Sequence, residues 1–251
     1  MALKAPPLVL LHGYPFDHTM WGLVAARLTC DLITPDLPGF GRAPLSSGAP
    51  SVDLMADDVA RMLDQLKIQD AIVAGFSMGG YVALAFAEGH PGRLAGLGLI
   101  NSQTLADTDE VRAGRRTMIE KVRREGAAAA AAAAVPKLFA RPDASKSELG
   151  NIPRKAAEQA GVSGISWALE AMARRPDRTS VLDKLQVPIL LIHSTEDKFI
   201  PVERARTLAQ RIPKALFVEV EGVGHCSPLE APEIVAKALG ELVGAVQAQS
   251  Q

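Results

Sequence analysis

The 251-residue sequence contains only two cysteines, Cys30 and Cys226. Two isolated cysteines form neither a metal-binding spacing nor a disulfide framework. Positive and negative charges nearly cancel, with 27 Lys and Arg residues against 28 Asp and Glu residues, and the positive charges form no stripe along the chain. A nucleic-acid-binding protein is expected to carry such a stripe. We therefore expect neither a metal ion nor a nucleic-acid partner.

Long apolar runs are also absent. No run approaches the roughly 18 residues that a membrane-spanning helix needs, and residues 1–7 lack the apolar core of a signal peptide. Gly39 and Gly41 form a short glycine pair without the third glycine of a dinucleotide-binding loop. Apolar residues still make up 48 % of the chain, enough for the core of one domain, with or without an insertion. These features predict a cytoplasmic protein with no membrane partner and no cofactor.

The most informative stretch is G-F-S-M-G-G at residues 75–80. It follows the apolar residues 71–74, which predict a buried strand, and precedes residues 81–88, which predict a helix. A serine between two glycines at a strand-to-helix turn is typical of a nucleophile elbow. Glycine permits the close backbone approach that so sharp a turn requires. The same motif also occurs as a plain turn, so its meaning depends on the rest of the chain.

Alternating strand and helix patterns predict an α/β fold. The predicted strands begin near residues 8, 31, 71, 95, 188 and 216. Right-handed crossovers would join these six strands into a mostly parallel, doubly wound sheet with helices on both faces. Residues 103–178 break the alternation, because they contain helical patterns and no strand; eight alanines at 127–134 predict a helix that continues to Phe139. We predict a core of residues 1–102 and 179–251, with residues 103–178 inserted as a helical cap.

Three polar residues follow predicted strands and would meet at the carboxyl edge of the sheet. In chain order they are Ser77, Asp197 and His225, which is one known order of a Ser-Asp-His triad. A serine hydroxyl needs a base to take its proton, and the base needs an acid that orients it. We assign the base to His225 and the acid to Asp197, with Glu196 as the competing acid.

The remaining histidines fit the role of the base less well. His12 precedes a loop glycine, His18 and His90 lie at predicted helix boundaries, and His193 ends a predicted strand, where it reads as a packed polar residue. Asp36 also follows a strand, but it precedes the elbow and falls outside the expected order.

A tetrahedral intermediate on Ser77 would need donors for its oxyanion. One donor is the backbone N–H of the residue after the nucleophile, Met78. The second is expected from the loop after the first strand, where Tyr14 is the candidate, because Pro15 has no N–H to donate.

Together these segments resemble the α/β-hydrolase superfamily over nearly the whole chain. The motifs that carry the resemblance are H-G-Y-P at 12–15, D-L-P-G-F-G at 36–41, G-F-S-M-G-G at 75–80, E-D with Pro201 at 196–201, and G-V-G-H at 222–225. In that family the acid commonly stands four residues before a proline, which favours Asp197. The chain is similar to bacterial aryl- and carboxylesterases and to cofactor-free haloperoxidases. Its segment 126–140 is more loosely similar to 3-oxoadipate enol-lactonase.

The chain differs from the family in its number of strands, and its nucleophile distinguishes it from some members. Family members usually carry two more strands before the one at residue 8, so we expect a shortened sheet with residues 31–34 at its edge. Haloalkane dehalogenases and epoxide hydrolases have Asp at the nucleophile position, and dienelactone hydrolases have Cys, whereas this chain has Ser77.

These arguments predict a metal-free serine hydrolase that acts on small, uncharged carboxylic esters. Its pocket should be apolar. The residues proposed to line it, each of which could equally belong to the core, are Trp21, Phe139, Trp167, Phe199 and Ile200.

Three alternatives stay open. The first is a lactonase, in particular one for an enol-lactone that carries carboxylates, which would need an arginine facing the site from the cap. The candidates are Arg112, Arg115, Arg116, Arg141, Arg154 and Arg174. The second is a perhydrolase or haloperoxidase that uses the same triad. The third is a ligand-binding protein that hydrolyses slowly or not at all, since a fold alone does not fix a function. The sequence does not determine the oligomeric state.

Overall fold

The computed structural model describes residues 5–249. Its centre is a six-stranded sheet with the order β2-β1-β3-β4-β5-β6, in which every neighbouring pair is parallel. The strands are β1 (Leu8–Leu11), β2 (Leu32–Ile33), β3 (Ala71–Phe76), β4 (Leu94–Ile100), β5 (Ile189–Ser194) and β6 (Leu216–Val220). The predicted parallel sheet is confirmed, and the short β2 lies at its edge as expected.

The inner strands are mainly apolar because helices cover both faces of the sheet. Every residue of β1, β3 and β5 is buried. Helix α3 (Met78–Gly89) packs on β3 and β4 and is itself covered by α2 (Val52–Gln65). Helix α11 (Pro232–Gln249) packs on β4 and β5. The remaining elements of this part of the chain are short or peripheral: η1 (His18–Trp21), α1 (Gly22–Ala25), η2 (Pro91–Arg93), α9 (Val202–Arg211) and α10 (Ser227–Glu230).

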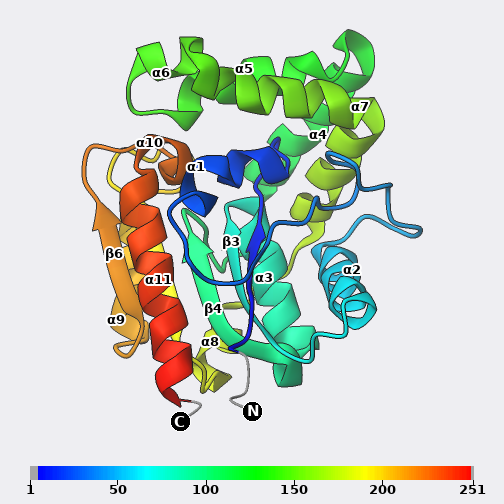
Figure 1. Cartoon of the computed structure of the whole chain (residues 1–251). Coiled ribbons are helices and arrows are strands. Elements are labelled where there is room, and N and C mark those ends of the chain that lie inside the picture. Colours follow the sequence, from blue (N-terminus) through cyan, green and yellow to red (C-terminus); the bar gives the residue numbers. More distant parts are fainter. Residues whose placement is uncertain (1–4, 250–251) are drawn as a thin grey trace.

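Five helices lie between β4 and β5 in the sequence, where an insertion was expected. They are α4 (Asp109–Glu125), α5 (Ala128–Leu138), α6 (Pro142–Lys146), α7 (Glu148–Arg174) and α8 (Thr179–Lys184). α7 packs against α4, α5 and α6, and Figure 1 shows α5, α6 and α7 stacked across one end of the sheet, with α8 at the other end. Within residues 5–249, each helix is too short or too polar to span a lipid bilayer.

The alanine-rich segment forms a helix, but it does not continue the preceding one. Gly126 has φ +88° and ends α4, whose last N–H···O bond runs from Gly126 to Val122. Glycine adopts this left-handed conformation without the steric penalty of a Cβ. The chain therefore turns at Gly126, and the alanine helix α5 runs separately.

Arg178 joins this inserted segment to the helices beneath it. Its side chain is 5 % exposed and forms ion pairs with Glu88 on α3, at 2.8 Å, and with Asp53 on α2. Removal of the guanidinium would leave two carboxylates without a partner, although both are more than half exposed and water can solvate them.

We predict that Arg178→Met lowers the free energy of unfolding by about 1–3 kcal/mol, below the loss expected when both partners are buried, because water solvates the carboxylates left behind. Arg206→Met is the matched control, since Arg206 also pairs with two carboxylates, Glu203 and Glu219, but on the surface. Urea denaturation of both variants is the measurement. Equal losses in the two variants would contradict the role given to burial.

Candidate active site

The turn at Ser77 joins β3 to α3 and brings backbone segments unusually close together. Ser77 has φ +50° and ψ −111°, a conformation that is rare for a residue with a side chain. A Cβ at Gly75 would lie 2.0 Å from the carbonyl oxygen of Gly79, and a Cβ at Gly79 would lie 2.2 Å from that of Leu11. Glycine is therefore required on both sides of Ser77, and the sharp turn predicted from the motif is present.

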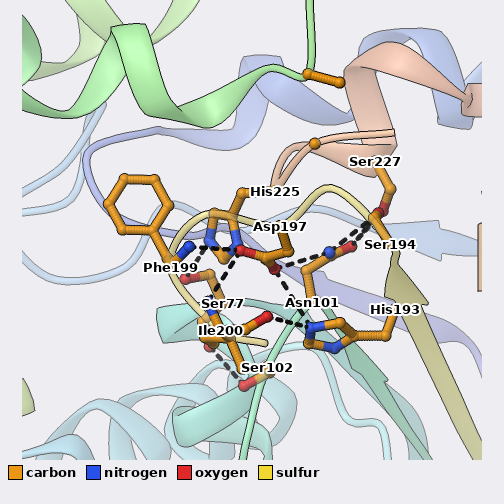
Figure 2. A network of polar contacts seen from close by, with 12 residues as sticks. Ser77, Asn101, Ser102, His193, Ser194, Asp197, Phe199, Ile200, His225 and Ser227 are labelled. Atoms are coloured by element: carbon orange, nitrogen blue, oxygen red, sulfur yellow. Dashed lines mark hydrogen bonds and ion pairs between the residues drawn. The ribbon is translucent and has the colours of Figure 1, made fainter. Parts of the chain in front are cut away.

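The hydroxyl of Ser77 meets His225, as Figure 2 shows. Ser77 Oγ lies 2.9 Å from His225 Nε2, and His225 Nδ1 lies 2.7 Å from Asp197 Oδ2. The tautomer that suits both contacts carries its proton on Nδ1, donates it to the carboxylate, and leaves Nε2 free to accept from the serine. His225 is only 3 % exposed, so little water competes for these bonds.

Asp197 is held from several sides. Its Oδ1 accepts the backbone N–H groups of Phe199, at 2.8 Å, and Ile200, at 3.0 Å, while its Oδ2 accepts from His225 and from Asn101 Nδ2, at 3.0 Å. Burial alone would raise the pKa of the Asp197 carboxyl, but its electrostatic interaction with His225 and the surrounding hydrogen bonds hold it well below its usual value. The carboxylate stays ionised and can stabilise an imidazolium.

A buried polar network behind Asp197 was not predicted. Asn101, directly after β4, accepts from Ser227 Oγ at 2.6 Å and donates to Ser194 Oγ at 3.0 Å. His193 Nε2 lies 2.8 Å from the Ile200 carbonyl oxygen and 3.4 Å from Asp197 Oδ2 (Figure 2). Asn101 follows a predicted strand at the same edge as Ser77, and this position was the available signal.

Two backbone N–H groups at the site have no acceptor of their own in the described structure, that of Met78, which follows Ser77, and that of Tyr14, which lines the same cavity as Ser77. Met78 is the first residue of α3, and such a residue has no intrahelical acceptor. The Tyr14 N–H forms no hydrogen bond within the described residues. The loop that carries Tyr14 is fixed by His12, whose Nε2 accepts the N–H of Leu37 at 2.8 Å. Burial lowers the pKa of His12 to about 4, so His12 is a neutral, loop-shaping residue, as expected.

The loop that carries His225 is fastened to the end of α5. Glu230 accepts the N–H of Gly224 at 2.8 Å and that of Ala140 at 3.0 Å, and the N–H of Cys226 donates to the Leu138 carbonyl at 2.9 Å. A Cβ on Gly224 would lie 2.4 Å from the nitrogen of Ala140. The position of His225 thus depends directly on the inserted helices.

Ser77 and His225 open into a cavity of about 560 Å³. Phe199 and Ile200, two of the five residues proposed for the pocket, line it. The other three aromatic residues proposed for the pocket do not line it, and this expectation is corrected: Trp21, Phe139 and Trp167. They are buried in the hydrophobic core at 0 %, 1 % and 9 % exposure, because the structure uses their large apolar area for packing between elements.

Small side chains form one wall of the cavity instead. Ala130, Ala133 and Ala134 on α5 all line it, and their spacing places them on one helix face. Since alanine fills little volume, this face leaves room beside Ser77. The helical spacing within the alanine run was the signal that could have identified this wall. Of the six arginines considered, Arg115 on α4 lines the cavity.

Within residues 5–249, no cluster of three or more His, Cys, Asp or Glu side chains is arranged to hold a metal ion. The free thiol of Cys226 is fully buried next to His225, and burial raises its pKa well above the usual value. It is therefore an inert thiol rather than a second nucleophile.

Comparisons with known proteins identify relatives of the chain. The sequence model of the Alpha/beta hydrolase family matches residues 8–238. The chain is 30 % identical over 257 residues to a pimeloyl-[acyl-carrier protein] methyl ester esterase from Aromatoleum aromaticum, a match that covers 96 % of this chain and 99 % of that protein.

Two solved structures have folds similar to that of this chain. A thermophilic esterase from Thermogutta terrifontis has a TM-score of 0.89 and 36 % identity, covering 97 % of this chain and 91 % of that one. An enol-lactonase from Burkholderia xenovorans LB400 has a TM-score of 0.86 and 27 % identity, covering 96 % and 92 %.

We predict that Asn101→Ala lowers kcat/KM for p-nitrophenyl butyrate about 10- to 100-fold, because a hydrogen bond to the buried carboxylate of Asp197 is lost while two backbone donors remain. Ser194→Ala is the control, since Ser194 contacts Asn101 and not Asp197, and it should cost much less. Steady-state rates over a range of pH, with melting curves for both variants, provide the measurement. Equal rate losses would mean that Asn101 does not act through Asp197.

Proposed function

Because the chain belongs to the alpha/beta hydrolase family and resembles esterases along nearly its whole length, we propose that it hydrolyses carboxylic esters through an acyl-enzyme on Ser77. The observation that carries this proposal is the unbroken hydrogen-bonded path from Ser77 Oγ through His225 to Asp197. This path begins at the wall of a cavity large enough for a small substrate.

In the proposed reaction, Ser77 attacks the ester carbonyl while its proton passes to His225 Nε2. The imidazolium that forms is stabilised by Asp197, which stays ionised. His225 then protonates the leaving alcohol. A water molecule, deprotonated by the same nitrogen, attacks the acyl group and releases the acid together with free Ser77.

The backbone N–H groups of Met78 and Tyr14 are the proposed oxyanion hole. Both belong to segments beside Ser77, and neither has an acceptor of its own in the described structure. The loss of one such donor typically slows a reaction about 10²- to 10³-fold. The N-terminus of α3 adds a favourable dipole at the same point.

We assign residues 103–178 the role of a cap on a core formed by residues 1–102 and 179–251. α4, α5 and α7 supply one side of the cavity, and the strand-end loops supply the other. Enclosure of the ester between them would exclude bulk water and strengthen the electrostatic interactions on which the reaction depends. The contacts of Glu230 and Cys226 with the end of α5 would tie the base to this cap.

Lactone hydrolysis is the second candidate, because a lactone is a cyclic ester and the same residues would open it. It is favoured by one specific observation, the presence of Arg115 in the cavity wall. The likeness to an enol-lactonase supports the same candidate.

The test compares wild type with Ser77→Ala on p-nitrophenyl acetate and butyrate, with a fluorophosphonate probe to count reactive serines. Wild type should turn over both esters and label stoichiometrically. Ser77→Ala should abolish labelling and lower kcat at least about 10⁴-fold, since the nucleophile is lost and only binding and the oxyanion donors remain. Ser47→Ala, at an exposed loop position, is the control and should match wild type.

Labelling that persists in Ser77→Ala would refute the assignment of the nucleophile. Labelling of Ser77 without turnover of any ester or lactone would instead support the ligand-binding alternative.

A further inference from the structure

The cavity wall carries a local excess of positive charge. Its cationic side chains are Arg115, Lys137, Lys198 and Arg204, against a single carboxylate, Asp107. The whole chain has a formal net charge of −1, so the excess belongs to the cavity and not to the protein surface in general. A cleft lined by one sign of charge concentrates ligands of the opposite sign.

Asp107 does not neutralise this excess, because it is already shared by two arginines. Its Oδ2 lies 2.6 Å from Arg115 Nε, and its Oδ1 lies 2.6 Å from Arg175 Nη1. The side chains of Asp107 and Arg175 are 1 % and 2 % exposed. Burial alone would raise the pKa of Asp107, but the two guanidinium groups hold it below its usual value. With the carboxylate ionised, the cluster retains one uncompensated positive charge.

Several donors around this cluster lack an acceptor in the described structure. Arg175 Nε and Nη2 are buried without a hydrogen-bond partner, and so is Tyr14 Oη. Arg115 Nη1 meets only the thioether of Met172, at 3.4 Å, and a thioether is a weak acceptor. The Arg175 guanidinium lies 3.9 Å from the centre of the Tyr81 ring. An uncompensated buried charge and unpaired donors are both costly. Tyr14 and Arg115 line the cavity, whereas Arg175 does not, so an anion bound in the cavity would offset the charge and accept from Tyr14 and Arg115.

Two of these groups share a cavity with the reacting serine. Tyr14 and Arg115 line the cavity together with Ser77 and His225. Tyr14 comes from the loop after β1, whereas Arg115 comes from α4, so the sheet edge and the inserted helices each contribute one donor. Burial raises the pKa of the Tyr14 phenol, against the opposing charge of Arg115, and the phenol therefore keeps its proton.

We propose that this part of the cavity is a carboxylate-binding subsite, in which Arg115 and the hydroxyl of Tyr14 bind a carboxylate of the substrate. Asp107 and Arg175 hold Arg115 in place and supply the excess charge. The substrate class is then an ester or lactone that carries a second, ionised carboxyl group. This inference rests on the proposed hydrolase function, and it replaces the sequence-based expectation of an uncharged substrate. The exposed lining residues Lys137, Lys198 and Arg204 would draw such an anion toward the site.

The first arm of the test compares monomethyl glutarate with methyl pentanoate, two methyl esters of five-carbon acids that differ in the second carboxylate. Wild type should favour the charged ester in kcat/KM by about tenfold or more, as expected for a charge-assisted hydrogen bond. Arg115→Gln should bring this ratio close to unity. The matched control is Arg116→Gln, which removes an exposed positive charge from the same helix outside the cavity and should leave the ratio unchanged.

The second arm measures binding without catalysis. Glutarate is titrated calorimetrically into Ser77→Ala, alone and combined with Arg115→Gln, Tyr14→Phe or Arg116→Gln. Binding should weaken about tenfold or more with Arg115→Gln and about three- to tenfold with Tyr14→Phe, and it should persist with Arg116→Gln. Tyr14→Phe retains the ring and the backbone, so it decides the question if Arg115→Gln, which strips Asp107 of a partner, fails to fold.

The outcomes separate the two proposals. Equal or better turnover of methyl pentanoate, together with glutarate binding that is indifferent to Arg115 and Tyr14, would overturn the subsite and leave the Ser77 hydrolase intact. Glutarate binding that depends on Arg115, without hydrolysis of any ester and without labelling of Ser77, would support the subsite and overturn the hydrolase.

Discussion

The hydrogen bond of 2.9 Å between Ser77 Oγ and His225 Nε2 joins residues 148 positions apart in the chain. It can form only if the parallel sheet brings the ends of β3 and β6 to one edge and if Ser77 adopts a backbone conformation that side chains rarely occupy. Gly75 and Gly79 remove the clashes that would prevent this conformation. The contact between Ser77 and His225 therefore depends on the two glycines, on the strand order, and on the loop that Glu230 holds in place.

Two buried electrostatic environments of opposite character lie close to that contact. Around Asp197, a buried carboxylate is compensated by three donors and by an imidazole that can become charged. Around Asp107, a buried carboxylate is overcompensated by two guanidinium groups. The first arrangement suits a group that must store a positive charge on its neighbour during the reaction. The second suits an empty place for a negative charge, because its donors exceed its acceptors.

The sequence predicted the elements whose cause is local or periodic. Alternating strand and helix patterns predicted the six strands, and the elbow motif with the chain order of Ser77, Asp197 and His225 indicated residues that the structure does bring together. Catalytic roles for these residues stay predictions. The sequence did not separate core residues from pocket residues. Trp21 and Phe199 are both large aromatic side chains, yet Trp21 is fully buried and Phe199 is exposed.

Pairings between distant segments were also invisible in the sequence. Asp107 and Arg175 meet across the inserted helices, and neither residue stood out before the structure placed them together. Asn101 was missed because an amide after a strand has no motif of its own. The alanine run predicted a helix but not its place in the site, where its small side chains form one wall of the cavity that Ser77 also lines.

The central claim is that Ser77 carries the acyl group during turnover. The most direct measurement is mass spectrometry of wild type, quenched rapidly with acid after mixing with p-nitrophenyl butyrate, because the good leaving group favours fast acylation and lets the acyl-enzyme accumulate before water releases it. The account predicts one butyryl group per chain, located by peptide mapping on the segment that contains Ser77. A butyryl group found reproducibly on another residue, with the segment that contains Ser77 unmodified, would contradict it.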